Sequence, residues 1–137
     1  MIFNYMRAFV ATLLMVGGIN GAVADQSQID PAALAVAQSY FDALRAGDGE
    51  TLLSLFAGKE RSRSEAQLSD PAYSQLLSDR YRNARFEVTD GGVRSGISFV
   101  DITIWINDAE LFKERRVLRP SGDDAALHIV ARKELLD

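Results

Sequence analysis

The spacing of apolar residues changes once along this chain of 137 residues, close to Asn83. Before that point apolar residues recur every three to four positions, which is the spacing of helices that bury one face. After it they alternate with polar residues, as Ala84, Phe86 and Val88 do, which is the spacing of half-buried strands. Helices followed by a run of strands predict an α+β fold with an antiparallel sheet.

Helix boundaries are marked in the first half of the chain. Asp-Pro pairs at 30–31 and 70–71 predict two helix starts, because aspartate is a favoured N-cap and proline loses no hydrogen bond at the first helical position. Gly47 is expected to end the first helix, and a short second helix should occupy 48–57. We therefore expect three N-terminal helices.

Residues 59–69 are polar and charged without apolar periodicity, which predicts a mobile loop or a lid. The strand patterns that follow indicate an antiparallel sheet of about four strands, with Asp90-Gly91-Gly92 as the first turn. The predicted strands cover residues 84–89, 97–106, 111–119 and 125–132.

The N-terminus has the three parts of a secretory signal peptide. A short region ending in Arg7 precedes an apolar stretch, and Ala22-Val23-Ala24 forms a small-x-small cleavage site. The apolar stretch is about half of the roughly 20 residues that a bilayer span needs, so no stable membrane anchor is expected. We expect cleavage after Ala24 and a periplasmic or secreted domain at 25–137.

Composition excludes several functional classes. The chain has no cysteine, so neither a disulfide nor a thiolate metal site is available. His128 is the single histidine, so no metal site and no cofactor are expected. Loss of Arg7 with the signal leaves 14 basic against 19 acidic residues, a formal charge of -5, which argues against nucleic acid as a partner.

Several segments resemble the NTF2-like (cystatin-like) superfamily. These are AQSYFDALRAGD at 37–48, the pairs LL at 52–53 and LF at 55–56, and YRNARFEV at 81–88. The resemblance implies helices packed on a curved antiparallel sheet over nearly the whole of 25–137. It does not select a chemistry, because the superfamily includes isomerases, dehydratases, SnoaL-like polyketide cyclases, transport factors and exported proteins.

Pairing between the two long strands supplies the candidate site residues. A four-residue loop would place Asp101 opposite Arg116 and Trp105 opposite Phe112, which joins opposite charges and two aromatic rings. Together with Phe99, these residues could line the polar floor of a ligand pocket. The alternative is a salt bridge on an outer or dimer-forming face. We favour this alternative because the isoleucine-rich face of the strand should pack against the helices, which would leave the Asp101 face outside.

Three functions remain open on this pattern. The preferred one is a non-enzymatic envelope module that binds a small apolar or amphipathic ligand, or a protein partner. An isomerase-like or dehydratase-like enzyme would need Asp101 as general base with a tyrosine as proton donor, for which Tyr40, Tyr73 and Tyr81 are the candidates. The third is a structural module that forms a homodimer through its sheet.

The signal peptide gives the first prediction. N-terminal sequencing of the mature protein should begin at Asp25, because Ala22-Val23-Ala24 presents small side chains at the two positions that signal peptidase reads. A chain that keeps Met1 and fractionates with the membrane would contradict this prediction.

Overall fold

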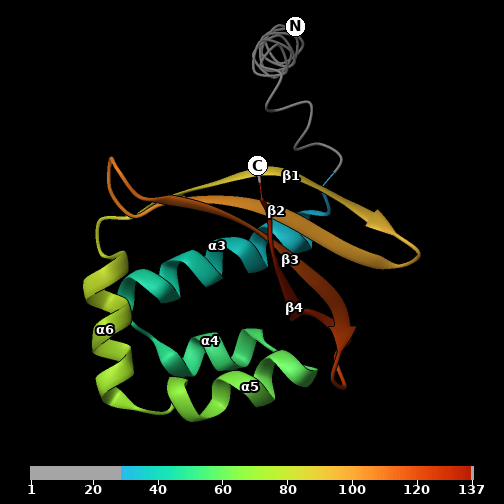
Figure 1. Ribbon diagram of the computed structural model, residues 1–137. Helices are drawn as coiled ribbons and strands as arrows, with labels where there is room; N and C mark the ends of the chain where they lie inside the picture. Colours follow the sequence, from blue (N-terminus) through green and yellow to red (C-terminus); the bar gives the residue numbers. More distant parts are fainter. Residues whose placement is uncertain (1–28, 137) are drawn as a thin grey trace, which may run out of the picture.

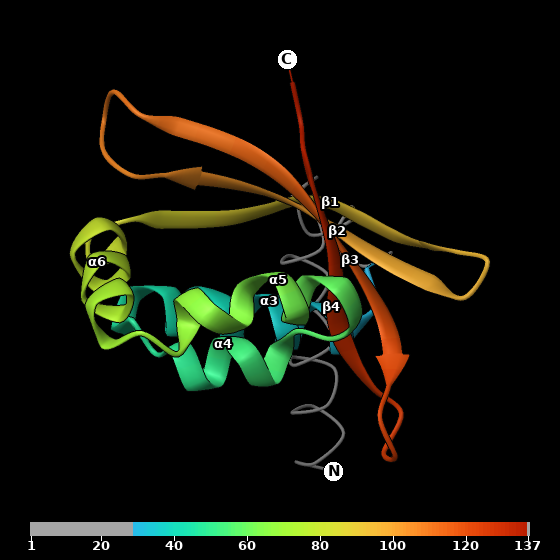
Figure 2. The same cartoon turned by 60° about the horizontal axis from the view of Figure 1, so that its bottom comes forward.

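The computed structural model describes residues 29–136, so the predicted signal peptide lies outside the described residues. Four helices come first and four strands follow, and their bounds are α3 (Pro31–Ala46), α4 (Gly49–Leu55), α5 (Gly58–Leu68), α6 (Pro71–Tyr81), β1 (Arg85–Arg94), β2 (Ile97–Trp105), β3 (Leu111–Ser121) and β4 (Ala126–Glu134). The strands form a curved antiparallel sheet in the order β1-β2-β3-β4, and the helices lie on one side of it (Figures 1 and 2). The predicted α+β class is confirmed.

The predicted helix caps are present. The Asp30 carboxylate accepts a hydrogen bond from the Ala32 amide at 2.9 Å, and Asp70 does the same for Ala72 at 2.9 Å. Gly47 ends α3 in the left-handed conformation, with φ of 65°. These ends are correctly predicted because a cap depends on residues within one turn of it.

The prediction of a mobile loop at 59–69 is wrong, because residues 58–68 form α5. The apolar pattern did not predict this helix, because its buried residues are Glu60 and Leu68 and a buried charged residue adds nothing to an apolar period. Its start is fixed to the sheet, since the Ala57 amide donates to the Ile129 carbonyl at 3.0 Å. Figure 2 shows α5 lying alongside α4, on the side of the helical layer near β4.

The predicted position of the first turn of the sheet is also wrong. Asp90-Gly91-Gly92 belongs to β1, which has a register shift between Val88 and Asp90. The chain turns instead at Ser95 and Gly96, both of which have positive φ as a tight hairpin requires.

The predicted register between β2 and β3 is wrong by one residue. Asp101 pairs with Arg115 rather than Arg116, and Trp105 pairs with Leu111 rather than Phe112. The connection has five residues instead of four: the Ile106 amide donates to the Glu110 carbonyl at 2.9 Å and closes the loop. Since side chains alternate between faces, a shift of one residue moves every β3 side chain to the opposite face relative to β2.

The isoleucine-rich face of β2 meets the helices, as expected. Val100, Ile102 and Ile104 are each 1% exposed and pack with residues of α3. Phe112 now lies on this inner face opposite Ile104, so the predicted packing of Phe112 on Trp105 is wrong. Trp105 instead lies under the Arg85 guanidinium, 4.4 Å from its ring centre. None of the helices in residues 29–136 is both long and apolar enough to cross a membrane.

Two glycines with positive φ provide a matched test of the packing between α3 and α6. A Cβ at Gly47 would lie 2.2 Å from the Ser74 carbonyl oxygen of α6, whereas a Cβ at Gly58 would meet nothing within 4 Å. Gly58→Ala should cost about 1–2 kcal/mol, the strain of a left-handed non-glycine residue. Gly47→Ala should cost about 1–3 kcal/mol more, because α6 must move. Chemical denaturation measures both, and equal losses would show that the close approach is absent.

Candidate functional site

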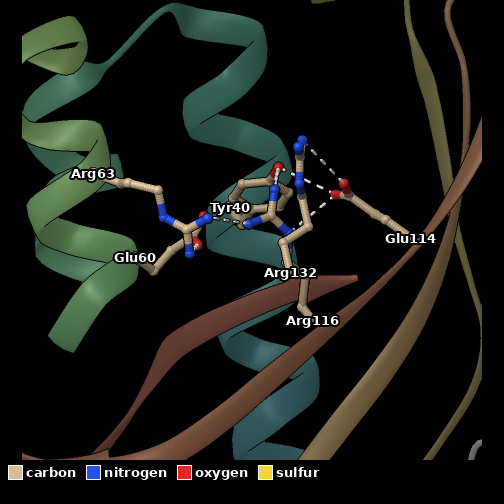
Figure 3. A network of polar contacts seen from close by, with 6 residues as sticks. All are labelled: Tyr40, Glu60, Arg63, Glu114, Arg116 and Arg132. Atoms are coloured by element: carbon tan, nitrogen blue, oxygen red, sulfur yellow. Dashed lines mark hydrogen bonds and ion pairs between the residues drawn. The ribbon is translucent and has the colours of Figure 1, made fainter. Parts of the chain in front are cut away.

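A cavity of about 300 Å³ lies between the helices and the inner face of β3 and β4. Its wall contains residues of every helix and of both strands. They are Tyr40, Leu44, Leu52, Phe56, Glu60, Arg63, Ser64, Gln67, Leu68, Tyr73, Leu77, Tyr81, Arg116 and Arg132. Figure 3 shows the polar groups of this region, with Tyr40 and Arg116 between α5 on one side and Glu114 on the other.

Arg116 is the centre of a buried ion-pair network. Its side chain points inward from β3, two residues from Glu114 and therefore on the same face. Nε donates to Glu114 Oε1 at 3.1 Å, and Nη1 donates to Glu60 Oε1 at 3.2 Å (Figure 3). Burial by itself would lower the pKa of Arg116, but Tyr40 and the two carboxylates outweigh it and raise the pKa.

Tyr40 completes the network from α3. Its hydroxyl accepts a hydrogen bond from Nη2 of Arg116 and donates one to Glu114 Oε1 at 3.3 Å. The Arg116 guanidinium also lies over the Tyr40 ring, 4.5 Å from its centre. Burial raises the pKa of Tyr40, and the nearby Glu114 charge adds to the rise while Arg116 opposes it. Tyr40 is therefore a neutral donor at ordinary pH.

Two exposed arginines lie at the rim of the cavity. Arg63 of α5 approaches Glu60 Oε2 with Nη2 at 3.4 Å, and Arg132 of β4 approaches Glu114 Oε2 with Nη1 at 4.0 Å. Their side chains are 72% and 60% exposed. Each carboxylate thus has one oxygen on Arg116 and the other on a rim arginine. These contacts are longer than the bonds to Arg116, and they join exposed guanidinium groups to carboxylate side chains that are 11% and 4% exposed.

A second cavity adjoins the first. It has a volume of about 290 Å³ and shares Tyr40, Tyr81 and Arg132 with the first cavity. Its other lining residues are Arg80, Phe112, Lys113, Glu114 and Glu134. The Arg132 side chain therefore stands where the two cavities meet.

The structure divides the five predicted site residues between the two faces of the sheet. Arg116 lines the first cavity and Phe112 the second, whereas Asp101, Phe99 and Trp105 lie outside on the opposite face. The predicted pair of Asp101 with Arg116 is wrong for the same reason as the register.

Asp101 has a different partner on the outer face. Its two carboxylate oxygens accept from Nε and Nη2 of Arg115 at 2.7 and 3.0 Å. The Arg115 guanidinium also covers the Phe99 ring at 4.3 Å. Asp101 is therefore held in a bidentate pair away from the cavities.

Glu60, Arg63, Glu114 and Arg132 were not among the site residues predicted from the sequence. A usable signal was present in α5, where Glu60, Ser64 and Gln67 recur at helical spacing and all line the cavity. This polar stripe carries the helical period that the apolar residues of the segment lack. Within residues 29–136, acidic and histidine side chains do not gather in any group of three or more that could hold a metal ion.

The network predicts which arginine the fold requires. Arg116→Gln should cost about 3–5 kcal/mol, because it leaves buried carboxylates without their cation. The neighbouring Arg115→Gln breaks a partly buried pair on the outer face, in which the Asp101 side chain is 11% exposed, and should cost about 1–3 kcal/mol. Denaturant midpoints measure both changes.

A double-mutant cycle separates the two faces. Asp101→Asn should couple to Arg115→Gln by about 0.5–3 kcal/mol and should be close to additive with Arg116→Gln. Coupling of Asp101 to Arg116 instead would restore the register predicted from the sequence and contradict the structure.

Comparisons with known proteins identify no family for this chain. No protein-family model matches, and no curated protein matches. A solved structure titled "Rd1NTF2_04 with long sheet" is similar, at 17% identity and with a TM-score of 0.49, over 75% of this chain and 99% of that chain.

Proposed function

We propose that the domain is an exported, non-enzymatic binding module of the NTF2-like type, which takes a small amphipathic molecule into the cavity beside Arg116. The observation that carries this proposal is the cavity itself, which has an apolar side and a charged side. At about 300 Å³ it is at the lower end of the range of about 300–1,000 Å³ found for ligand pockets.

The two sides come from different elements. The apolar side is built from one leucine of each helix, namely Leu44 of α3, Leu52 of α4, Leu68 of α5 and Leu77 of α6. The charged side is built from Glu60, Arg63, Arg116 and Arg132. A ligand that matches both sides has a short apolar body and one polar end.

The geometry supports binding better than proton transfer. Glu60 and Glu114 are both paired with Arg116, so either carboxylate would have to give up an ion pair to act as a base. Tyr40 already donates to Glu114. Asp101, the base that an isomerase-like enzyme would use, lies on the other face of the sheet.

The other sequence-based functions receive less support. The outer sheet face carries two large aromatic residues, and arginines cover both rings: Arg115 over Phe99 and Arg85 over Trp105. The same face carries the ion pair of Asp101 with Arg115, and acidic residues are depleted at the core of protein interfaces. An envelope partner and a homodimer therefore stay predictions from the sequence.

A fluorescent probe tests the proposal. Anilinonaphthalene sulfonate, an amphipathic molecule that fluoresces in apolar surroundings, should bind the folded domain. Ser64 lines the cavity from a partly exposed position on α5, so Ser64→Phe should fill space there and weaken binding on the order of tenfold.

The matched control is Ser62→Phe, on an exposed position of the same helix that does not line the cavity. It should bind the probe as the wild type does. Equal binding by Ser64→Phe and Ser62→Phe, or no binding by the wild type, would show that the cavity is not the ligand site.

A further inference from the structure

We infer that the molecule bound in the cavity is a monoanion, such as a carboxylate or sulfonate, and that Arg63 and Arg132 recognise its charged end. This inference rests on the proposed function and names the class of ligand for the same site. It follows from how the donors of the three cavity arginines are used.

Arg116 is already bound through each of its three guanidinium nitrogens. Nε donates a hydrogen bond to Glu114, Nη1 donates one to Glu60, and Nη2 donates one to Tyr40. The side chain is 5% exposed. Arg116 is thus an internal cation, and a ligand that displaced one of its partners would leave a buried carboxylate or hydroxyl unsatisfied.

The rim arginines are in the opposite situation. Arg63 meets Glu60 through one nitrogen at 3.4 Å, and Arg132 stands 4.0 Å from Glu114, beyond hydrogen-bond distance. A guanidinium carries five N–H donors in a planar fork that fits a carboxylate or sulfonate. Most donors of both side chains therefore have no partner within residues 29–136 and are open to water.

The charges of the network also favour an anion. Three guanidinium groups, of Arg63, Arg116 and Arg132, share two carboxylates, of Glu60 and Glu114. The formal charge of this group is +1, and the excess lies at the rim because Arg116 is compensated from both sides. One negative charge at the mouth neutralises it, whereas a cation would meet repulsion there.

Position within the cavity fits the same class of ligand. The apolar side chains of Leu52 and Leu77 line the cavity together with the two rim arginines. An amphipathic anion can therefore place its apolar body among the leucines while its charged end stays at the partly hydrated rim. This arrangement avoids the cost of taking the charge fully out of water.

Two probes that share one aromatic body test the inference. Anilinonaphthalene sulfonate carries a negative charge, and N-phenylnaphthylamine is the same body without the sulfonate. The sulfonate should bind the wild-type domain on the order of tenfold more tightly, a difference of about 1.4 kcal/mol. Rising salt should weaken the sulfonate and leave the uncharged probe unchanged.

Four variants locate the charge that is recognised. Arg63→Gln and Arg132→Gln should each weaken the sulfonate several-fold and leave N-phenylnaphthylamine unchanged. Arg61→Gln on α5 and Lys133→Gln on β4 are the matched controls: each removes a positive charge from the same element at a position outside the cavity lining, and neither should change either affinity. Thermal melting should show that all four remain folded.

The outcomes separate the inference from the proposed function. Equal affinity for the two probes, with both lost in Ser64→Phe, would overturn the anion preference and leave the binding module standing. A sulfonate preference that Arg61→Gln or Lys133→Gln reduces as much as the rim variants do would also overturn it, since any positive charge would then suffice. Failure of both probes to bind the wild type would reject the proposed function itself.

Discussion

The buried guanidinium of Arg116 is the interaction on which the arrangement of helices over the sheet depends. It joins Tyr40 of α3, Glu60 of α5 and Glu114 of β3, which no other single side chain of the network does. A buried charge costs several kcal/mol unless it is paired and hydrogen-bonded. The three elements must therefore hold their partners in place together, and α5, which has little apolar surface of its own, gains its position partly from this requirement.

The same network gives the cavity its character. Its inner groups satisfy one another, and no buried side-chain nitrogen or oxygen in residues 29–136 lacks a hydrogen-bond partner. The polar wall is consequently preorganised and has little to gain from a ligand at its centre. What remains available is the rim, where Arg63 and Arg132 make long, exposed contacts. Binding at the rim would order these two side chains, at a cost of about 0.5–1.5 kcal/mol each, and would leave the buried network unchanged.

Cross-strand pair energies alone do not determine the register between β2 and β3. Asp101 opposite Arg116 and Asp101 opposite Arg115 both join opposite charges, so pair energies of about 0.2–1 kcal/mol could not choose between them. The choice was made by the loop, where the Asn107 side chain accepts from the Ala109 and Glu110 amides at 2.9 Å, and by burial of Glu114 with Arg116 on the inner face. One extra loop residue carried Phe112 and Arg116 to the opposite face from Asp101, Phe99 and Trp105.

The sequence by itself determined the order of helices and strands, the α+β class and the ends of α3 and α6, because caps and apolar periods depend on residues within a few positions of one another. Tertiary structure alone decided that 58–68 is a helix, which face of β3 meets the helices, and where the cavity lies. Glu60 and Arg116 are 56 residues apart, and Tyr40 and Arg116 are 76 apart. A charged residue that is buried because of a partner distant in the sequence has no signature among its own neighbours. The network that forms the site is therefore visible only in the folded chain.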